Sequence, residues 1–132
     1  MNRLDQELIP EEALLSERHE YVIVNQDVAR VGISHIAADR LSTVVSIELP
    51  EVGQIIEQGD PLATLETETG EMEVFSPVSG EVVSINDALV AEPLNLTHDS
   101  YGLGWLVEIS PSDAQELSAL MSPEAYLQSI AG

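Results

Sequence analysis

The sequence predicts a mostly β fold with a β-rich core and peripheral helices. Two observations lead to this prediction. Short segments rich in β-branched residues alternate along the chain with Gly, Pro, Asn and Asp, which is typical of strands joined by tight turns. A shift of 27 residues also places Pro50 on Pro77 and Gly53 on Gly80, and similar apolar residues follow each glycine. This internal repeat predicts two similar units of strand, turn and strand.

The expected elements begin after an N-terminal arm. Residues 1–15, with Pro10 in the middle, are expected to form a helical turn or a loose arm ahead of a domain over residues 16–132. A short helix is expected from residue 34 to residue 41. Strands are expected at 21–24, 29–32, 44–49, 61–66, 73–75, 80–85 and 105–109.

Two further helices are expected at the C-terminal end, because the same signal occurs there twice. Ser110 is followed by Pro111, and Ser122 is followed by Pro123. Serine is a favourable N-cap residue, and proline is favourable at the first helical position. These pairs predict one helix over residues 114–121 and another from residue 123 to about residue 130.

Composition limits the classes of function. The chain of 132 residues has 24 acidic residues, four arginines and no lysine, which gives a formal net charge of −20. This charge repels phosphate backbones and anionic lipid headgroups, so neither nucleic acid nor a membrane is an expected partner. The chain has no cysteine and no apolar run of signal-peptide or membrane-spanning length, which favours a cytoplasmic protein. The acidity is expected to serve solubility or to suit a high-salt cytosol.

The segment from residue 65 to residue 74 predicts an acidic hairpin. If Thr69 and Gly70 form a two-residue turn, Leu65 lies opposite Val74 and Thr67 lies opposite Met72. Side chains alternate between the two faces of a strand, so the apolar residues share one face and the acids share the other. The four acids of this face are Glu66, Glu68, Glu71 and Glu73.

The function of this acidic face stays open on the residues alone. One interpretation is a solvated hairpin without chemistry. A second is a site for a divalent cation, since carboxylate oxygens are the ligands that calcium and magnesium prefer, although no firm metal ligand set is present. A third is a docking surface for arginine or lysine side chains of a partner. Opposed like charges are unfavourable by roughly 0.2–1 kcal/mol per pair, so a compensating partner is physically reasonable.

An ordered series of segments resembles the H protein of the glycine cleavage system, a member of the biotinyl/lipoyl carrier fold. The resemblance covers residues 16–130 and therefore nearly the whole chain. It implies a flattened β-barrel or sandwich of two similar β units. The segments that carry it are Ser16 to Tyr21, Val31 to Ser34, Val44 to Gly53, Ser76 to Val82, Ile85 to Leu89, Tyr101 to Leu106 and Leu120 to Tyr126.

In that family, a lysine at the tip of the hairpin between the two units carries lipoate. Alignment without gaps from Ser76 and Pro77 back to Gly59 and Asp60 places Thr69 at the lysine position. A hydroxyl cannot form the amide that holds the lipoyl arm, and the chain has no other lysine. The resemblance therefore implies a carrier scaffold without its cofactor, and biotin is excluded by the same argument.

Three hypotheses for function follow. The first is a non-lipoylated, non-catalytic binding or regulatory module that docks on glycine-cleavage or lipoate-handling enzymes. The second is a divalent-cation-binding protein that uses the hairpin from Glu66 to Glu73. The third is an engineered or degenerate variant of a carrier.

No catalytic residues are expected. The histidines are His19, His35 and His98, and their spacing matches no common metal or catalytic motif, so we expect structural or surface roles. His19 and Glu20 also fall in the family's opening segment, where the resemblance implies residues that line the cleft for the loaded arm. Phe75 and Trp105 are expected to pack in the core.

Overall fold

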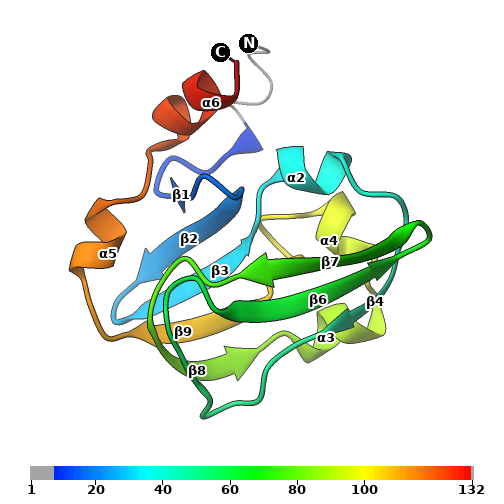
Figure 1. Ribbon diagram of the computed structural model, residues 1–132, viewed down its shortest axis with the longest axis horizontal. Helices are drawn as coiled ribbons and strands as arrows, with labels where there is room; N and C mark the ends of the chain where they lie inside the picture. The colour runs from blue at the N-terminus through cyan, green and yellow to red at the C-terminus, as the bar shows by residue number, and fades with distance from the viewer. Residues whose placement is uncertain (1–7, 132) are drawn as a thin grey trace.

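The computed structural model describes residues 8–131 and contains two antiparallel β-sheets that pack face to face, with short helices around them (Figure 1). The larger sheet has six strands in the order β1, β2, β3, β9, β8 and β5, and the smaller sheet has three strands in the order β4, β6 and β7. The two sheets are not closed into a barrel. Of the two expected architectures, the sandwich is therefore confirmed.

The elements have the following bounds. The larger sheet contains β1 (Leu14–Leu15), β2 (Glu20–Asn25), β3 (Val28–Ile33), β5 (Ile55–Ile56), β8 (Gly80–Ile85) and β9 (Val107–Pro111). The smaller sheet contains β4 (Val44–Glu48), β6 (Pro61–Thr67) and β7 (Gly70–Phe75). The helices include α2 (His35–Asp39), α3 (Asp87–Ala91), α4 (Asn95–His98), α5 (Gln115–Ser118) and α6 (Pro123–Ala131). Among the described residues, none of the helices has the length and apolar character needed to cross a bilayer.

Most of the expected strands are confirmed, but two C-terminal boundaries differ. Strand β9 runs to Pro111, which was expected to open a helix, and pairs there with Gly80 of β8. Helix α5 covers Gln115–Ser118 instead of the expected residues 114–121, and the N–H of Gln115 donates to Oδ1 of Asp113. Helix α6 agrees with the prediction, because the Oγ of Ser122 accepts from the N–H of Ala125 and caps it. Strands β1 and β5 and helices α3 and α4 were not expected.

Residues 8–15 differ from the expected helical turn or loose arm, because they contain strand β1 and pack into the folded domain. Ile9, Ala13 and Leu15 are buried in a small second core together with Tyr21, Tyr126 and Leu127. The backbone of Leu15 also bonds with that of Met121 in both directions at 2.8 Å. Burial of these apolar side chains against α6 supplies the free energy that orders the segment. Residues 1–7 of the expected arm lie outside the described residues.

The internal repeat corresponds in the structure to two pairs of equivalent strands. The 27-residue shift relates β4 to β7, which flank β6 in the smaller sheet, and it relates β5 to the middle of β8. Strands β5 and β8 pair with each other, with Ile56 opposite Gly80 and the N–H of Gly53 donating to the oxygen of Val82. The repeat then diverges, since Asp60 precedes a strand whereas Asp87 begins helix α3.

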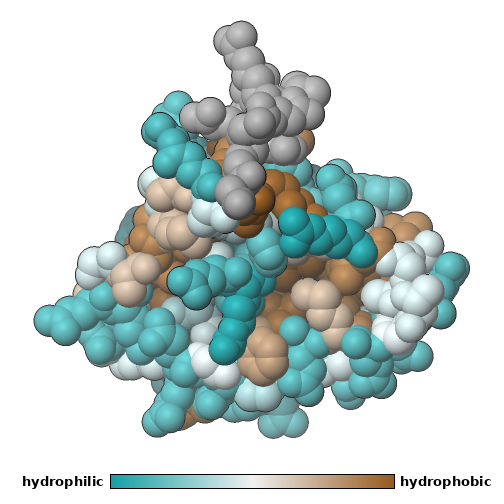
Figure 2. All heavy atoms as spheres, turned by 45° about the horizontal axis from the view of Figure 1, so that its top comes forward, coloured by the Kyte–Doolittle hydropathy of each residue, from teal (hydrophilic) through white to brown (hydrophobic). Residues whose placement is uncertain are grey.

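The main core lies between the two sheets. Apolar side chains from both contribute to it, for example Val31 and Ile109 from the larger sheet and Leu65 and Val74 from the smaller one, all at most 1% exposed. Hydrophilic residues cover much of the face that Figure 2 presents, with apolar residues visible between them. The sandwich therefore holds the β6–β7 hairpin by its apolar side and leaves the other side in solvent.

Candidate functional site

The tip of the β6–β7 hairpin is formed by Glu68 and Thr69, one residue earlier than expected. Thr67 pairs with Gly70, so the expected pairs are wrong by two residues: Leu65 lies opposite Met72, and Glu66 lies opposite Glu71. The Oγ1 of Thr67 explains this turn, because it donates to the oxygen of Gly70 at 2.8 Å and accepts from the N–H of Thr69 at 3.3 Å. A threonine can close a turn through its own hydroxyl in this way.

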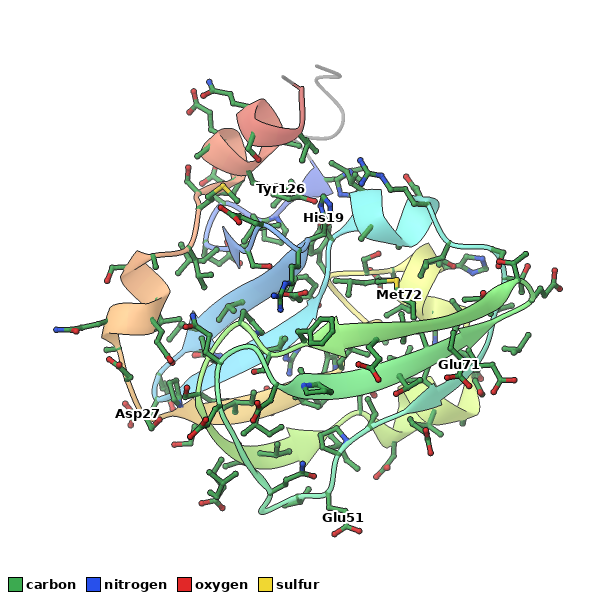
Figure 3. The ribbon with its side chains drawn as sticks, in the orientation of Figure 1. His19, Asp27, Glu51, Glu71, Met72 and Tyr126 are labelled. Carbon is green, nitrogen blue, oxygen red and sulfur yellow. The ribbon has the colours of Figure 1, made fainter. Side chains whose placement is uncertain are left out.

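The predicted division of the hairpin into two faces is nevertheless correct. A register shift of two residues leaves every side chain on its original face, because the pleat has a period of two. Leu65 and Val74 are buried and Met72 is half-buried, whereas Glu66, Glu71 and Glu73 are exposed on the other side. Figure 3 shows the labelled Met72 and Glu71 on opposite sides of the hairpin.

The four glutamates of the hairpin do not assemble into a metal site. Glu66 and Glu71 lie opposite each other, Glu73 lies opposite Thr64, and Glu68 lies in the turn. Within residues 8–131, no three acidic or histidine side chains are arranged so that they could hold a metal ion. The acids form a charged strip along the hairpin, with Ser46 donating to Oε2 of Glu66 at 3.1 Å. The geometry therefore gives the cation-binding hypothesis no support.

Thr69 is exposed at the hairpin tip and is joined to the loop before β4. Its Oγ1 shares a hydrogen bond of 2.8 Å with the Oγ of Ser42, and the N–H of Glu68 donates to the oxygen of Thr43 at 3.0 Å. Together with Arg40, these segments line a depression of about 180 Å³. No local sequence signal pointed to Ser42 or Arg40, because they meet the hairpin only through the fold.

The residues at the tip do not fit a lipoyl group. An amide to the lipoyl carboxyl requires an amine, and the side chains of Glu68 and Thr69 offer a carboxylate and a hydroxyl. The cationic side chain that lines the depression is the Arg40 guanidinium, which does not serve as an amine nucleophile near neutral pH because it stays protonated. What the tip presents is a polar, hydroxyl-bearing turn beside an acidic strip.

Glu20, the second of the two expected cleft residues, lines a different hollow. This pocket has a volume of about 390 Å³ and is bordered by Arg18, Gln58, Ser76 and Met121, among others. The residue Glu20 is 4% exposed, and its carboxylate accepts from the Oγ of Ser16 at 2.7 Å. Burial raises the pKa of Glu20 above that of an ordinary glutamate, while the Ser16 hydrogen bond and the charge of Arg18 act in the opposite direction.

His19 points elsewhere, into a hydrogen-bond chain beneath α6. Arg40 can only donate, so its contact of 3.3 Å makes the Nε2 of His19 an acceptor and places the ring hydrogen on Nδ1. Nδ1 then donates to the hydroxyl of Tyr126 at 2.6 Å, and this hydroxyl contacts the Oγ of Ser34 at 2.8 Å. Figure 3 shows His19 and Tyr126 side by side. Burial and the charge of Arg40 lower the pKa of His19, in keeping with the neutral ring.

The remaining candidates have structural or surface positions. His35 is buried and its Nδ1 contacts the Tyr101 hydroxyl at 2.8 Å, while His98 is exposed on α4. Phe75 and Trp105 are half-buried at the surface rather than in the core, because Arg18 lies over the Phe75 ring at 4.8 Å and Arg30 over the Trp105 ring at 4.6 Å. The guanidinium groups cover these rings in place of apolar neighbours.

Removal of the Tyr126 hydroxyl is expected to destabilise the docking of α6. Tyr126→Phe keeps the ring packing but leaves the buried Ser34 and the Nδ1 of His19 without this partner. We expect the free energy of unfolding to fall by about 2 kcal/mol, measured by urea denaturation. A change of less than about 0.5 kcal/mol would show that water or another group satisfies both atoms.

The raised pKa of Glu20 predicts a pH-dependent contribution to stability. The folded protein holds the proton at Glu20 more tightly than the unfolded chain does. This contribution is therefore fully present below the unfolded pKa and is lost as the pH rises through the folded pKa. Urea unfolding of the natural chain and of Glu20→Gln at about pH 4 and about pH 8 should show the variant gaining relative stability at the higher pH. A difference that is the same at both values contradicts the prediction.

Comparison with known proteins shows which family shares this architecture. The family model described as glycine cleavage H-protein matches residues 14–131. The glycine cleavage system H protein of Corynebacterium jeikeium is 42% identical over 122 residues, which cover 89% of this chain and 94% of the relative. That of Thermus thermophilus is 36% identical over 118 residues, covering 89% of this chain and 92% of the relative.

A solved structure agrees with the sequence comparison. The crystal structure of a glycine cleavage system H protein from Mycobacterium marinum superposes with a TM-score of 0.85 at 27% identity, and the match covers 94% of this chain and all of that one. The predicted resemblance is thus confirmed, and so is the expectation that the chain is not an enzyme. The match to both the family model and its members over nearly the whole sequence shows that this chain belongs to the glycine cleavage H-protein family.

Proposed function

We propose that this chain is a non-lipoylated member of the H-protein family that acts as a binding or regulatory module. The observation that carries the proposal is the hairpin tip, where Thr69 stands at the position at which the family resemblance expects the modified lysine. The chain contains no lysine at all, so no neighbouring residue replaces it. On this proposal the protein carries neither lipoate nor biotin.

The fixed position of the hairpin and its exposed charges support a retained role in recognition of a partner. Its tip remains tied to the loop before β4 through Ser42 and Thr43, and its apolar side remains packed in the core. Glu66, Glu71 and Glu73 add a fixed row of negative charge on the exposed side. A rigid strip of one charge suits a partner with basic residues, because little conformational entropy is lost when it binds.

The partners that we propose are the glycine-cleavage and lipoate-handling enzymes. Such an enzyme would meet the same scaffold and hairpin that a lipoylated carrier presents, but without an arm to react. The chain would then occupy the carrier's docking surface and compete with it. We place this activity in the cytoplasm.

A competition experiment tests the proposal. Increasing amounts of the natural chain are added to an aminomethyl transferase or a lipoate–protein ligase together with an H protein that has the lipoyl-acceptor lysine. Binding is followed by fluorescence of the labelled H protein, and displacement is the expected result. The matched control is Glu66→Gln combined with Glu71→Gln, which removes two charges of the strip and should weaken the competition about fivefold. Failure of the natural chain to displace the carrier from any of the proposed enzymes contradicts the proposal.

A further inference from the structure

A third concave surface lies far from the hairpin tip, where the larger sheet ends at β5. We call it the β5 groove, and it has a volume of about 750 Å³ and opens to solvent. Ile55 and Glu57 line one side, Ser79 and Glu81 line its base, and Asp113 and Glu116 line the side toward α5. Figure 1 shows α5 at the left edge of the molecule and the β6–β7 turn at the right edge. The groove is therefore separate from the surface of the proposed function.

The groove contains an apolar contact point on a sheet edge. Ile55 is 71% exposed, whereas its neighbour Ile56 points into the core and is 2% exposed. Ile55 lies opposite Glu81 in the β5–β8 register, so the two side chains share the outer face. Strand β5 is the last strand of its sheet among the described residues. The groove runs from β5 across the start of β8 to the end of β9, so an extended segment that lies in it can cover Ile55 with an apolar side chain.

The walls of the groove are held in place by hydrogen bonds. The carboxylate of Glu116 accepts from the N–H of Ser79 at 2.7 Å and from its Oγ at 2.8 Å. The Oγ of Ser79 in turn accepts from the N–H of Gln58 at 2.8 Å. These bonds join α5 to the β5 and β8 sides of the groove. The concave shape is thus present before any partner binds, which reduces the entropy lost on binding.

The charge of the groove has one sign. Glu57, Glu81, Asp113 and Glu116 line it, and no lysine, arginine or histidine is among the described residues that do so. Carboxylates on opposite walls of a concave surface concentrate a negative potential in the space between them. A second copy of this chain, with its own net charge of −20, would be repelled. A basic occupant is attracted.

We propose that the β5 groove binds an extended, basic segment of a partner protein, in which an aliphatic residue stands between arginines or lysines. The aliphatic side chain covers Ile55, and the basic side chains on either side reach Glu57, Glu81 and Asp113. Such a segment matches both the exposed apolar residue and the charge of the walls. This site does not depend on the proposed function of the hairpin.

A titration with a defined peptide tests the assignment. The probe is a synthetic peptide of alternating arginine and valine, and binding to the full chain is measured by calorimetry at about 0.15 M salt. The groove variant combines Glu57→Gln, Glu81→Gln and Asp113→Asn and leaves Glu116 in place because it supports the wall. The matched control combines Glu11→Gln, Glu12→Gln and Glu92→Gln, three exposed acids outside both the groove and the hairpin, and has the same net charge. Circular dichroism confirms that both variants fold.

Comparison of the two triple variants distinguishes binding in the β5 groove from general electrostatic attraction to the acidic chain. We expect the groove variant to bind the peptide about tenfold more weakly and the control variant to bind within about threefold of the natural chain. Ile55→Ser should weaken binding about fivefold without any change in charge. Equal losses in the two triple variants, or no loss with Ile55→Ser, overturn the proposal. Dimers of the natural chain in sedimentation experiments that Ile55→Ser abolishes also overturn it, since a second copy would then occupy the groove.

Discussion

Replacement of Thr69 by lysine is expected to make this chain a substrate for lipoyl attachment, whereas the natural chain stays unmodified. Thr69 is exposed in a two-residue turn, and the family resemblance places the modified lysine at this position. Thr69→Lys supplies the missing amine at the hairpin tip, where the family resemblance implies that the ligase finds its acceptor lysine. Because an amide cannot form on a hydroxyl, the effect on modification should be all or none.

Intact-mass spectrometry after production with a lipoate–protein ligase and lipoate measures this effect. The matched control is Glu68→Lys, which places the same amine on the other residue of the turn and tests whether the enzyme requires position 69. A carrier domain with a known lipoyl-acceptor lysine serves as the positive control for ligase activity. A lipoyl adduct on the natural chain would refute the proposed function. A Thr69→Lys variant that folds but stays unmodified would show that the acidic neighbours prevent recognition.

Replacement of Gly80 by alanine is expected to lower the free energy of unfolding by about 3 kcal/mol. A Cβ at Gly80 would overlap the carbonyl oxygen of Ser110 and the side chain of Ile109, both on the neighbouring strand β9. The backbone of the strand cannot move away without breaking the pairing of β8 with β9. Position 80 therefore requires glycine, because β8 and β9 approach each other too closely there to leave room for a Cβ atom.

The internal repeat provides the matched control for this variant. Gly53 occupies the equivalent position in the first unit, with a φ of +95°, but a Cβ there would meet no atom within 4 Å. Gly53→Ala should therefore cost only the backbone strain of about 1 kcal/mol. Urea unfolding of both variants measures the difference. Equal losses at the two positions would show that backbone conformation, and not contact with β9, determines the need for glycine.

The hairpin illustrates how far local patterns carry a prediction. The alternation of Leu65, Thr67, Met72 and Val74 with glutamates correctly divided the strands into a buried and an exposed face. The same pattern did not fix the pairing, because registers that differ by two residues bury the same side chains. The turn was decided by Thr67, whose hydroxyl bonds to the residues around the tip. Gly70 alone had suggested a turn one residue later.

The neighbours His19 and Glu20 show what the sequence left open. The family resemblance implied that both line one cleft, but only Glu20 lines the hollow beside Arg18. His19 instead bonds to Tyr126, which is 107 positions away in the sequence, and to Arg40. Consecutive side chains leave the backbone in different directions, so adjacent residues can serve different surroundings. Which surroundings they meet depends on how α2 and α6 pack.

The sequence by itself determined most of the strands, the repeat, the division of the hairpin into faces and the absence of a lysine amine. Each of these depends on residue type, or on periodicity over a few positions, and both are visible along the chain. Only the tertiary structure decided the partners of Thr69, the burial of Glu20 and the shape of the β5 groove. These features join segments that lie far apart in sequence, and their geometry follows from the packing of the two sheets and the helices around the core.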